Sequence, residues 1–447
     1  MERIAITSER LSIDKTGFTF HHQNRFFRAI EKESQKEILD ILDSGLIEKL
    51  IEADLFPETG IADIQVEGYE LVLEHKMINH ITYPFEWSFS MLKDAALCIL
   101  NVAETCSEFG YGLHDLHNYN VVFEGCHPLF VDLGSIRKGC SFSDKVESFI
   151  DYNYLPLRLF SIGEMTVAKR ILSDEYPMRF EPWKPYHRSY LSREITKELI
   201  AGNAKNKIKS VFNSLGSNYN LKYNHLTPGL LKKRIEEMQK YPSSTTWGEY
   251  HSAYQKEGQN ELTPRFQRII ELLNELNVSE VLDCGGNQGL LSRLIREKCP
   301  KIREVVCIDH DENAIDQFYL SSKNSPFTRQ LFPVHSNLLY PIHVNYFQPF
   351  VRRMKSELVL ALAITHHLIL TQEFPLDFIL KQIRDLTGKY VFIEFMPLGL
   401  WGGGNRPEIP GWYTVEWFRN NFQNYFTLMF EEKLEEVFRE FGVPYIR

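Results

Sequence analysis

Cysteine pairs are missing from this sequence of 447 residues. Its seven cysteines are an odd number, and no two of them form a CxxC motif. This usage argues against a disulfide framework and is typical of reduced thiols, so we expect a cytoplasmic protein. The charged N-terminus, MERIAITSER, lacks the apolar core of a secretory signal.

A long apolar run and an excess of positive charge are missing as well. The longest apolar stretch, residues 358–370, is interrupted by two histidines and falls short of the ~18 residues that a membrane span needs. Lys and Arg number 50 against 59 Asp and Glu, for a net charge of −9. We therefore expect no membrane span and no nucleic-acid partner, because phosphate backbones attract a basic face.

The length exceeds what one hydrophobic core usually organises, and the sequence has neither internal repeats nor low-complexity tracts. Residues 241–262 are rich in polar and turn-forming types and lie between two periodic, helix-like stretches. We predict two domains, 1–240 and 241–447. The composition indicates no oligomeric state.

The two halves differ in their pattern of elements. The first half starts with a strand-like run at 18–30, a helical region at 34–53 and a strand at 69–78, and then a long helix at 88–110 that Gly110 and Gly112 end. This mixture predicts an α+β domain. The second half alternates helices with short apolar strands, which predicts an α/β, Rossmann-like parallel sheet. Its expected strands are 280–284, 304–309, 330–336, 357–363 and 390–395.

A glycine loop follows the first of these strands, in VLDCGGNQG. Asp283 ends the strand, Gly285, Asn287 and Gly289 follow, and a helix begins at once. Glycines let a ligand approach the backbone, and a helix N-terminus offers amide donors. Asp309 ends the next strand, where a carboxylate can accept hydrogen bonds from both hydroxyls of a ribose. The sequence thus predicts a nucleoside site, although the spacing is not GxGxxG and no GxxxxGK[ST] loop occurs.

This DxGxNxG loop, the acid after the second strand and ALAITHHL at 361–368 together are similar to class I S-adenosylmethionine (SAM) methyltransferases, over about residues 246–447. The resemblance implies SAM as the cofactor, with the loop around its methionine part, Asp309 at the ribose and Ser336 or Asn337 at the adenine edge. It also suggests that a helix bearing Trp247 and Tyr250 closes over SAM, although such an aromatic stripe is more often packing.

More narrowly, SFSMLKDAAL at 88–97, the Asp115-to-Asn120 stretch and ALAITHHL resemble SAM-dependent methyltransferases associated with nodulation factors and bacterial surface sugars. That resemblance spans nearly the whole chain and implies a carbohydrate or related small-molecule acceptor. The glycine-rich loop at 394–414 is either a lid over that acceptor or an irregular connection.

Methylating a hydroxyl requires the removal of its proton, for which an imidazole is suited. His366 and His367 follow the fourth strand at its carboxyl end, where open α/β sheets bind their ligands. Either one is a general-base candidate; the alternative is that they only hydrogen-bond the loop. An amino-methylating site would more often show an Asn-Pro-Pro-Tyr-like turn here, and the sequence has none.

The first half carries a second motif, in HDLHNYN and FVDLGS. Asn120 follows Asp115 by five residues, and Asp132 comes seventeen residues after Asp115. In protein kinases and related sugar and antibiotic phosphotransferases, an Asp takes the hydroxyl proton while an Asn and a second Asp hold metal. The stretch resembles the core of that fold, and so implies a kinase-like domain over 1–240.

The rest of a nucleotide site is incomplete in the sequence. No glycine-rich loop precedes RFFRAI at 25–30, and Arg28 stands where a strand lysine would meet the phosphates. Glu74 lies near the strand that would lead to an adenine-binding hinge. Use of ATP and Mg²⁺ therefore stays open between two hypotheses: a bifunctional enzyme that phosphorylates and then methylates a sugar end, and a frame that only helps to bind the acceptor.

Overall fold

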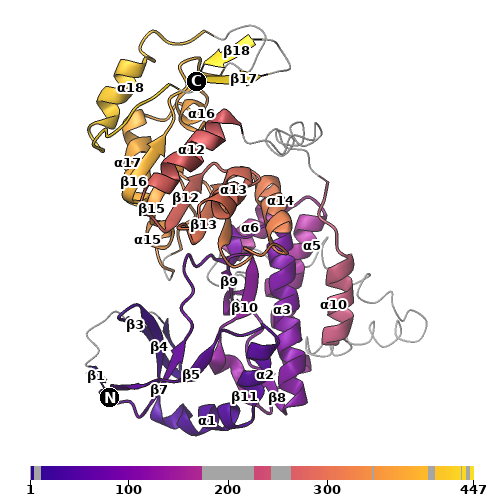
Figure 1. Cartoon of the computed structure of the whole chain (residues 1–447). Helices are drawn as coiled ribbons and strands as arrows, with labels where there is room; N and C mark the ends of the chain where they lie inside the picture. The colour runs from indigo at the N-terminus through magenta and orange to yellow at the C-terminus, as the bar shows by residue number, and fades with distance from the viewer. Residues whose placement is uncertain are drawn as a thin grey trace, which may run out of the picture. The chain divides into compact units, whose positions relative to one another are not determined.

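The described part of the chain forms two compact units in the computed structural model, drawn in Figure 1. The model describes residues 2–4, 12–173, 226–242, 263–344, 347–400, 408–433, 435–438 and 443–446. Unit 1 comprises Met1–Ile78, Leu92–Val122 and Pro128–Tyr241, and unit 2 comprises Asn79–Met91, Phe123–His127 and Pro242–Arg447. Two short segments of the N-terminal half thus belong to the C-terminal unit, which the sequence did not indicate.

Unit 1 is built on an antiparallel sheet with the strand order β2-β3-β4-β7-β5. The expected strand-like run at 18–30 is in fact two strands, because Gln23 and Asn24 have φ values of 48° and 60° and form the tight turn of a hairpin. The sheet strands are β2 (Ser12–Ile13), β3 (Gly17–His22), β4 (Arg25–Ile30), β5 (Thr59–Ile61) and β7 (Leu71–His75).

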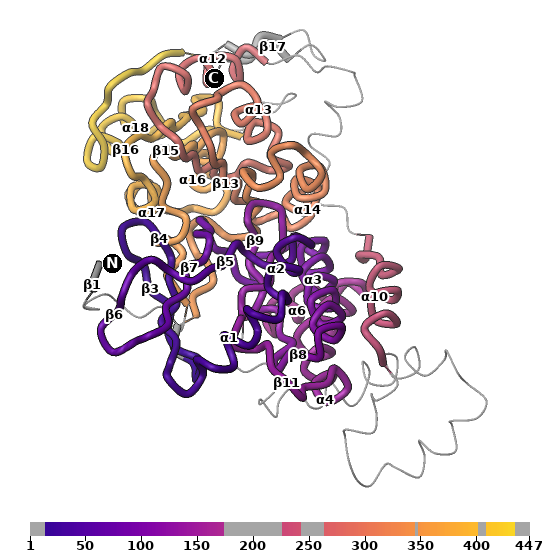
Figure 2. The backbone as a smooth tube through the Cα atoms, turned by 60° about the horizontal axis from the view of Figure 1, so that its bottom comes forward, coloured from indigo at the N-terminus to yellow at the C-terminus, as the bar shows by residue number. Residues whose placement is uncertain are grey.

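The helices of unit 1 agree with the expected pattern except for one break. Gly45, with a φ of 77°, splits the region at 34–53 into α1 (Gln35–Asp43) and α2 (Leu46–Glu52). The long helix is α3 (Phe89–Glu108), and α10 (Pro228–Glu237) lies alongside it in Figures 1 and 2. The other elements are β1 (Glu2–Ile4), β6 (Ile64–Val66), β8 (Tyr111–Leu113), β11 (Ile136–Lys138), α4 (Phe142–Phe149), α5 (Leu155–Ser161) and α6 (Met165–Leu172), while β9 (Val121–Glu124) and β10 (His127–Phe130) are divided between the two units. The expected α+β class is confirmed.

Unit 2 contains a parallel sheet with the order β14-β13-β12-β15-β16. The first strand along the chain, β12, lies between the second, β13, and the fourth, β15. This arrangement is that of a doubly wound, Rossmann-like sheet. All five expected strands are present, each within three residues of its expected limits. They are β12 (Glu280–Cys284), β13 (Glu304–Asp309), β14 (Leu331–His335), β15 (Ser356–Ala361) and β16 (Thr387–Ile393).

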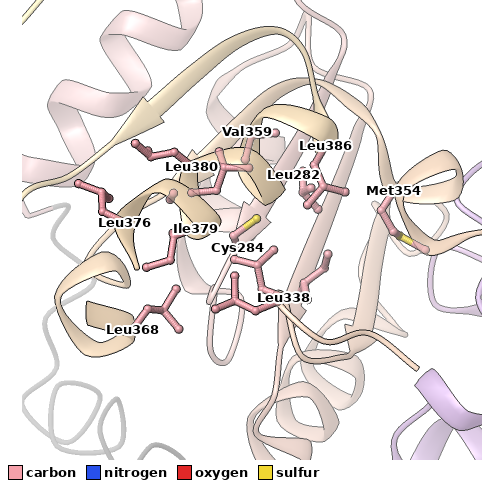
Figure 3. Close-up of a cluster of buried hydrophobic side chains, with 14 of the residues drawn as sticks. Leu282, Cys284, Leu338, Met354, Val359, Leu368, Leu376, Ile379, Leu380 and Leu386 are labelled. Carbon is pink, nitrogen blue, oxygen red and sulfur yellow. The ribbon is translucent and has the colours of Figure 1, made fainter. Parts of the chain in front are cut away.

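Helices cover both faces of this sheet. Alternate residues of β12 face opposite layers. Leu282 and Cys284 belong to a buried core that also contains Met354 of α15 and Ile379 and Leu380 of α17 (Figure 3). Asp283 faces the other layer and reaches Ser292 of α13. The helices are α12 (Pro264–Glu275), α13 (Leu290–Lys298), α14 (Glu312–Ser322), α15 (Phe350–Met354), α16 (Thr365–Leu370), α17 (Leu376–Leu386) and α18 (Val415–Phe422), and a hairpin of β17 (Glu435–Phe438) and β18 (Val443–Ile446) follows.

Residues 79–91 are bound into unit 2 by buried polar contacts. Arg353 of α15 forms a bidentate ion pair with Glu86, at 2.6 and 2.9 Å, and both side chains are at most 3% exposed. The ring of Tyr83 lies 4.4 Å from the Arg353 guanidinium. Two backbone amides at the start of α3 donate to carboxylates of α14: Phe89 N to Glu312 and Ser90 N to Asp316, both at 2.8 Å. This segment is therefore part of the folded unit rather than a linker.

Within the ranges that the structure describes, no helix is both long and apolar enough to cross a membrane.

Candidate functional site

The glycine loop after β12 is held in left-handed backbone conformations. Gly285, Asn287 and Gly289 have φ values of 71°, 52° and 63°. A Cβ atom on Gly289 would overlap the ring of Phe318, and one on Gly286 would lie 2.6 Å from the Cys307 sulfur. These glycines are therefore required by backbone strain and by close packing under the loop. Gly286 was not among the expected residues, although it stands inside the same motif.

Asp309 lies at the end of β13, beside this loop. Its Oδ2 accepts a hydrogen bond from Asn287 N at 2.9 Å, and its Oδ1 accepts one from Asp311 N at 2.8 Å. Two backbone amides thus fix the carboxylate in place. Because each carboxylate oxygen can accept more than one hydrogen bond, Asp309 keeps acceptor capacity for ligand hydroxyls.

Asp283 is placed differently from our expectation. We expected it among the residues around the ligand, but only 3% of its surface is exposed, and its carboxylate accepts a hydrogen bond from Ser292 Oγ at 2.8 Å. The alternation of β12 turns it toward α13, beneath the loop. Burial raises the pKa of Asp283 to about 6, although the hydrogen bond from Ser292 lowers that pKa in part. Asp283 therefore supports the loop from below.

The loop after β14 completes this edge of the sheet. Ser336 N donates to the carbonyl of Asp309 at 2.9 Å, which brings Ser336 next to that acid. The side-chain oxygen of Asn337 accepts hydrogen bonds from Leu339 N and Tyr340 N, at 2.9 and 3.0 Å. Ser336 thus lies next to Asp309, while the oxygen of Asn337 is used by a local turn.

Four histidines lie at the carboxyl end of the sheet, namely His310, His335, His366 and His367. His366 and His367 open α16, with ring centroids 4.0 Å apart; His366 is buried and His367 is half-buried. Burial lowers the pKa of His367, and the nearby His310 lowers it further. His310 follows Asp309, whose hydrogen bond raises the pKa of His310. A neutral imidazole and a more basic one therefore lie close together. His310 was missed, although its position after a strand-ending acid was a usable signal.

An ion pair that the sequence did not reveal stands at the same edge. Arg265, in the first turn of α12, donates from Nε and Nη2 to the two carboxylate oxygens of Glu394, at 2.6 Å each. Glu394 directly follows β16, and its carbonyl accepts a hydrogen bond from Thr365 Oγ1 at 2.8 Å. The pair joins the start of a helix to the ends of two strands.

Two expected features lie wholly or partly outside the described residues. Trp247 and Tyr250 are not described, and neither are residues 401–407 of the expected lid. In the described part of that loop, Trp412 is 51% exposed and its ring centroid lies 4.8 Å from that of Trp417. An exposed aromatic surface is thus present after β16.

In unit 1 the structure brings together the three residues of the phosphotransferase-like motif. Asn120 Nδ2 donates to the carbonyl of Asp115 at 3.4 Å, and Val131 N donates to the carbonyl of Asn120 at 2.8 Å. Burial raises the pKa of Asp132, and the charges of Asp14 and Asp115 raise it further, whereas Arg28 lowers it. These carboxylates are therefore close enough to repel one another.

Arg28 has a partner that the sequence did not suggest. Its Nη1 donates to Asp14 Oδ2 at 3.0 Å, and its side chain is 7% exposed. Asp14 is itself held in a turn by the amides of Thr16 and Gly17, at 2.7 and 3.0 Å. Glu74, expected near a hinge, pairs instead with Arg25 at 2.6 Å. Among the side chains that the structure describes, no group of three or more His, Cys, Asp or Glu residues is arranged to hold a metal ion.

Comparison with known proteins finds one distant sequence relative and several structural likenesses. No family model matches the chain. The chain is 24% identical over 416 residues to nodulation protein NoeA of Rhizobium meliloti (strain 1021), covering 86% of this chain and 83% of the relative.

Solved methyltransferase structures resemble part of the chain. A putative O-methyltransferase from Nostoc punctiforme PCC 73102 has a TM-score of 0.30 at 16% identity, over 45% of this chain and 58% of that one. The methyltransferase domain of bacterial CtHen1-C has a TM-score of 0.29 at 17% identity, over 40% and 92%. Scores of this size do not establish the fold, which follows instead from the strand order of unit 2.

Proposed function

We propose that the chain is a SAM-dependent methyltransferase that transfers a methyl group to an oxygen of a carbohydrate or related small-molecule acceptor. One arrangement carries this proposal: the left-handed glycine loop after β12 and the fixed carboxylate of Asp309 meet at the carboxyl edge of a Rossmann-like sheet. Nucleotide cofactors bind at that edge in doubly wound folds, with an acid at the ribose.

The residues present fit such a cofactor. Asp309 retains acceptor capacity for two ribose hydroxyls, and Ser336 lies beside it for the nucleobase side. The close packing at Gly286 and Gly289 leaves no space for side chains there, so the loop backbone stays near the ligand. SAM, when bound, supplies a methyl carbon on a positively charged sulfur. The remaining tasks, alignment of the acceptor and removal of its proton, fall to the protein.

For the proton, His367 is the stronger of the two expected candidates. Burial and the neighbouring His310 lower its pKa, so its imidazole is neutral and able to accept a proton near pH 7. His366 is 5% exposed, and its ring centroid lies 4.0 Å from that of His367. In the proposed reaction His367 takes the acceptor's hydroxyl proton, while His366 supports its ring.

A carbohydrate acceptor is supported by two observations. The resemblance at 88–97, 115–120 and 361–368 is to methyltransferases of nodulation factors and surface sugars, and the distant relative is named as a nodulation protein. The exposed ring of Trp412 after β16 offers a flat surface of the kind on which sugar rings pack.

The proposal is tested by incubating the protein with methyl-labelled SAM and a bacterial carbohydrate extract, and by identifying labelled products by mass spectrometry. We expect label on a hydroxyl of a saccharide, and a loss of about 10²-fold or more with His367→Ala while SAM binding persists. Binding of SAM without labelling of any acceptor would instead favour a SAM-sensing protein.

A second candidate function is phosphorylation of the same acceptor by unit 1, before methylation by unit 2. It is favoured by the close approach of Asp115, Asn120 and Asp132, the residue types that hold metal and take a hydroxyl proton in kinase-like domains. In this hypothesis residues 1–240 form a kinase-like domain that uses ATP and Mg²⁺. Phosphate transfer from ATP that Asp132→Ala leaves unchanged would refute it.

A further inference from the structure

The ion pair between Arg265 and Glu394 is the feature of unit 2 that the proposed roles leave unused. Both of its hydrogen bonds measure 2.6 Å, and the two side chains are only 10% and 13% exposed. This fork-to-fork geometry is the strongest form of an Arg–carboxylate contact, and it fixes both groups in direction.

A chain of short contacts connects this pair to the glycine loop. A Cβ atom on Gly285 would lie 2.9 Å from Ile364 Cδ1, and the next residue, Thr365, donates its hydroxyl to the carbonyl of Glu394. Glu394 N in turn donates to the carbonyl of Ala361, at the end of β15, at 3.1 Å. Residues 364 and 365 thus connect the glycine loop to the backbone of Glu394 at the carboxyl edge.

The pair and Asp309 lie on opposite sides of that loop. Asp309 ends β13, on one side of β12, whereas β15 and β16, which Glu394 follows, lie on the other side. A helix that precedes a parallel strand runs antiparallel to it, so α12 begins at the carboxyl edge with Arg265 in its first turn. A ligand whose ribose meets Asp309 and whose other end crosses the glycine loop therefore extends toward the side of the sheet where Arg265 and Glu394 lie.

The chemistry of that other end matches the pair. In SAM the part beyond the sulfur is an amino acid, which carries one carboxylate and one ammonium group on the same carbon. We infer that Arg265 and Glu394 bind this amino-acid end, with Arg265 donating to the carboxylate and Glu394 accepting from the ammonium. The inference rests on the proposed function, and it makes the pair the element that distinguishes SAM from other adenosine compounds.

A purely structural role is the competing explanation. If the pair only clamped α12 to β16, its loss would weaken the unit and affect every adenosine ligand alike. A direct role affects only ligands that carry the amino-acid end. Two compounds separate these outcomes: S-adenosylhomocysteine has that end, and 5′-methylthioadenosine has the same adenosine and sulfur without it.

The experiment is isothermal titration of the full chain with both compounds. Arg265→Ala, Arg265→Lys and Glu394→Gln are compared with Arg268→Ala, which removes a half-buried arginine three residues further along α12 that pairs with Glu432 and Glu271. We expect Arg265→Ala to weaken S-adenosylhomocysteine binding by roughly tenfold or more and to leave 5′-methylthioadenosine binding unchanged. Lysine keeps the charge but not the fork, so we expect an intermediate loss.

The outcomes are distinct. If the wild-type chain binds neither compound, both the proposed function and the inference fail. If it binds both, and the variants change the two affinities equally or not at all, only the inference is overturned. Binding of 5′-methylthioadenosine also reports that a variant is folded. If Arg265→Ala no longer binds this compound, the test rests on Arg265→Lys and Glu394→Gln, whose side chains are close in size to the originals.

Discussion

At the scale of single residues, the glycine loop shows how backbone strain and packing choose the same amino acid. Gly289 combines a φ of 63° with a Cβ position that the ring of Phe318 already fills. A spacing rule reports only that glycines occur there. The structure adds that the loop rests on Phe318 of α14, so its shape depends on that helix.

Replacement of Gly289 by alanine is accordingly expected to cost stability. The left-handed backbone and the overlap with Phe318 together predict a loss of roughly 1–3 kcal/mol in the free energy of unfolding. The measurement is urea unfolding followed by tryptophan fluorescence, since five of the six tryptophans belong to unit 2. Gly411→Ala, at a position with nothing within 4 Å of the new Cβ, is the control. Equal midpoints for the two variants would contradict the packing argument.

Asp283 predicts a pH dependence of stability. Its pKa in the folded chain is about 6 against an ordinary value of 3.8, so the folded state binds the proton more tightly than the unfolded state does. The stability that this group contributes is present below pH 3.8 and is lost as the pH rises to about 6. The loss amounts to roughly 3 kcal/mol for a shift of this size.

The matched variant is Asp283→Asn, which keeps an oxygen for the Ser292 hydroxyl and cannot ionise. We expect the free energy of unfolding of the variant, relative to wild type, to rise between pH 4 and pH 6.5 in urea titrations. A constant difference between the two proteins across that range would show that Asp283 titrates normally.

Much of the proposed cofactor site was predictable, because its residues follow strand ends at regular spacing. Asp309, Ser336 and His367 lie where that rule put them. Arg265 and Glu394 were not predictable, since the two are 129 residues apart and neither belongs to a motif. The burial of Asp283 beneath the loop was not predicted, because the alternation of a strand decides which face a side chain takes.

At the scale of elements, strands were the easiest to predict and the two inserted segments the hardest. Strands β12 to β15 of the parallel sheet are short, mostly buried and largely apolar runs, which is enough to mark a buried parallel strand. Residues 79–91 have no such periodicity, and their place in unit 2 depends on individual partners such as Glu86 with Arg353. The turn at Gln23 and Asn24 was also missed, because it depends on two positive φ angles without a glycine.

The buried pair of that segment predicts a large local effect. Arg353→Ala leaves the carboxylate of Glu86 buried without its partner, which we expect to destabilise unit 2 by about 3–5 kcal/mol. Hydrogen exchange of the amides in 79–91 and in α15 measures the loss. Arg352→Ala, at the exposed neighbouring position, is the control, and similar exchange in the two variants would contradict a stabilising role for the pair.

At the scale of the whole molecule, the chain passes between the two units five times, at 78/79, 91/92, 122/123, 127/128 and 241/242. A cut at 241 therefore detaches residues 79–91 and 123–127 from the rest of unit 2. Arg353, Glu312 and Asp316 each form a hydrogen bond with a residue of the segment 79–91. A fragment that comprises only residues 242–447 lacks these three partners.

We accordingly expect the fragment 242–447 to fold poorly by itself. Buried charges without partners, and the ring of Tyr319 without its contact to Phe123, should give dye binding and a broad unfolding transition. Addition of a peptide comprising residues 79–91 should partly restore cooperative unfolding, whereas a scrambled peptide should not. A sharp transition of the fragment alone, at the midpoint of the full chain, would rule this dependence out.

The central claim is that unit 2 binds SAM through the loop after β12 and Asp309. Isothermal titration of the full chain with S-adenosylhomocysteine tests it most directly. We predict one site with a dissociation constant on the order of micromolar, and a loss of about tenfold or more in Asp309→Ala with no change in Gly411→Ala. The contrary result, no binding of S-adenosylhomocysteine or SAM by the folded wild-type chain, would contradict the account.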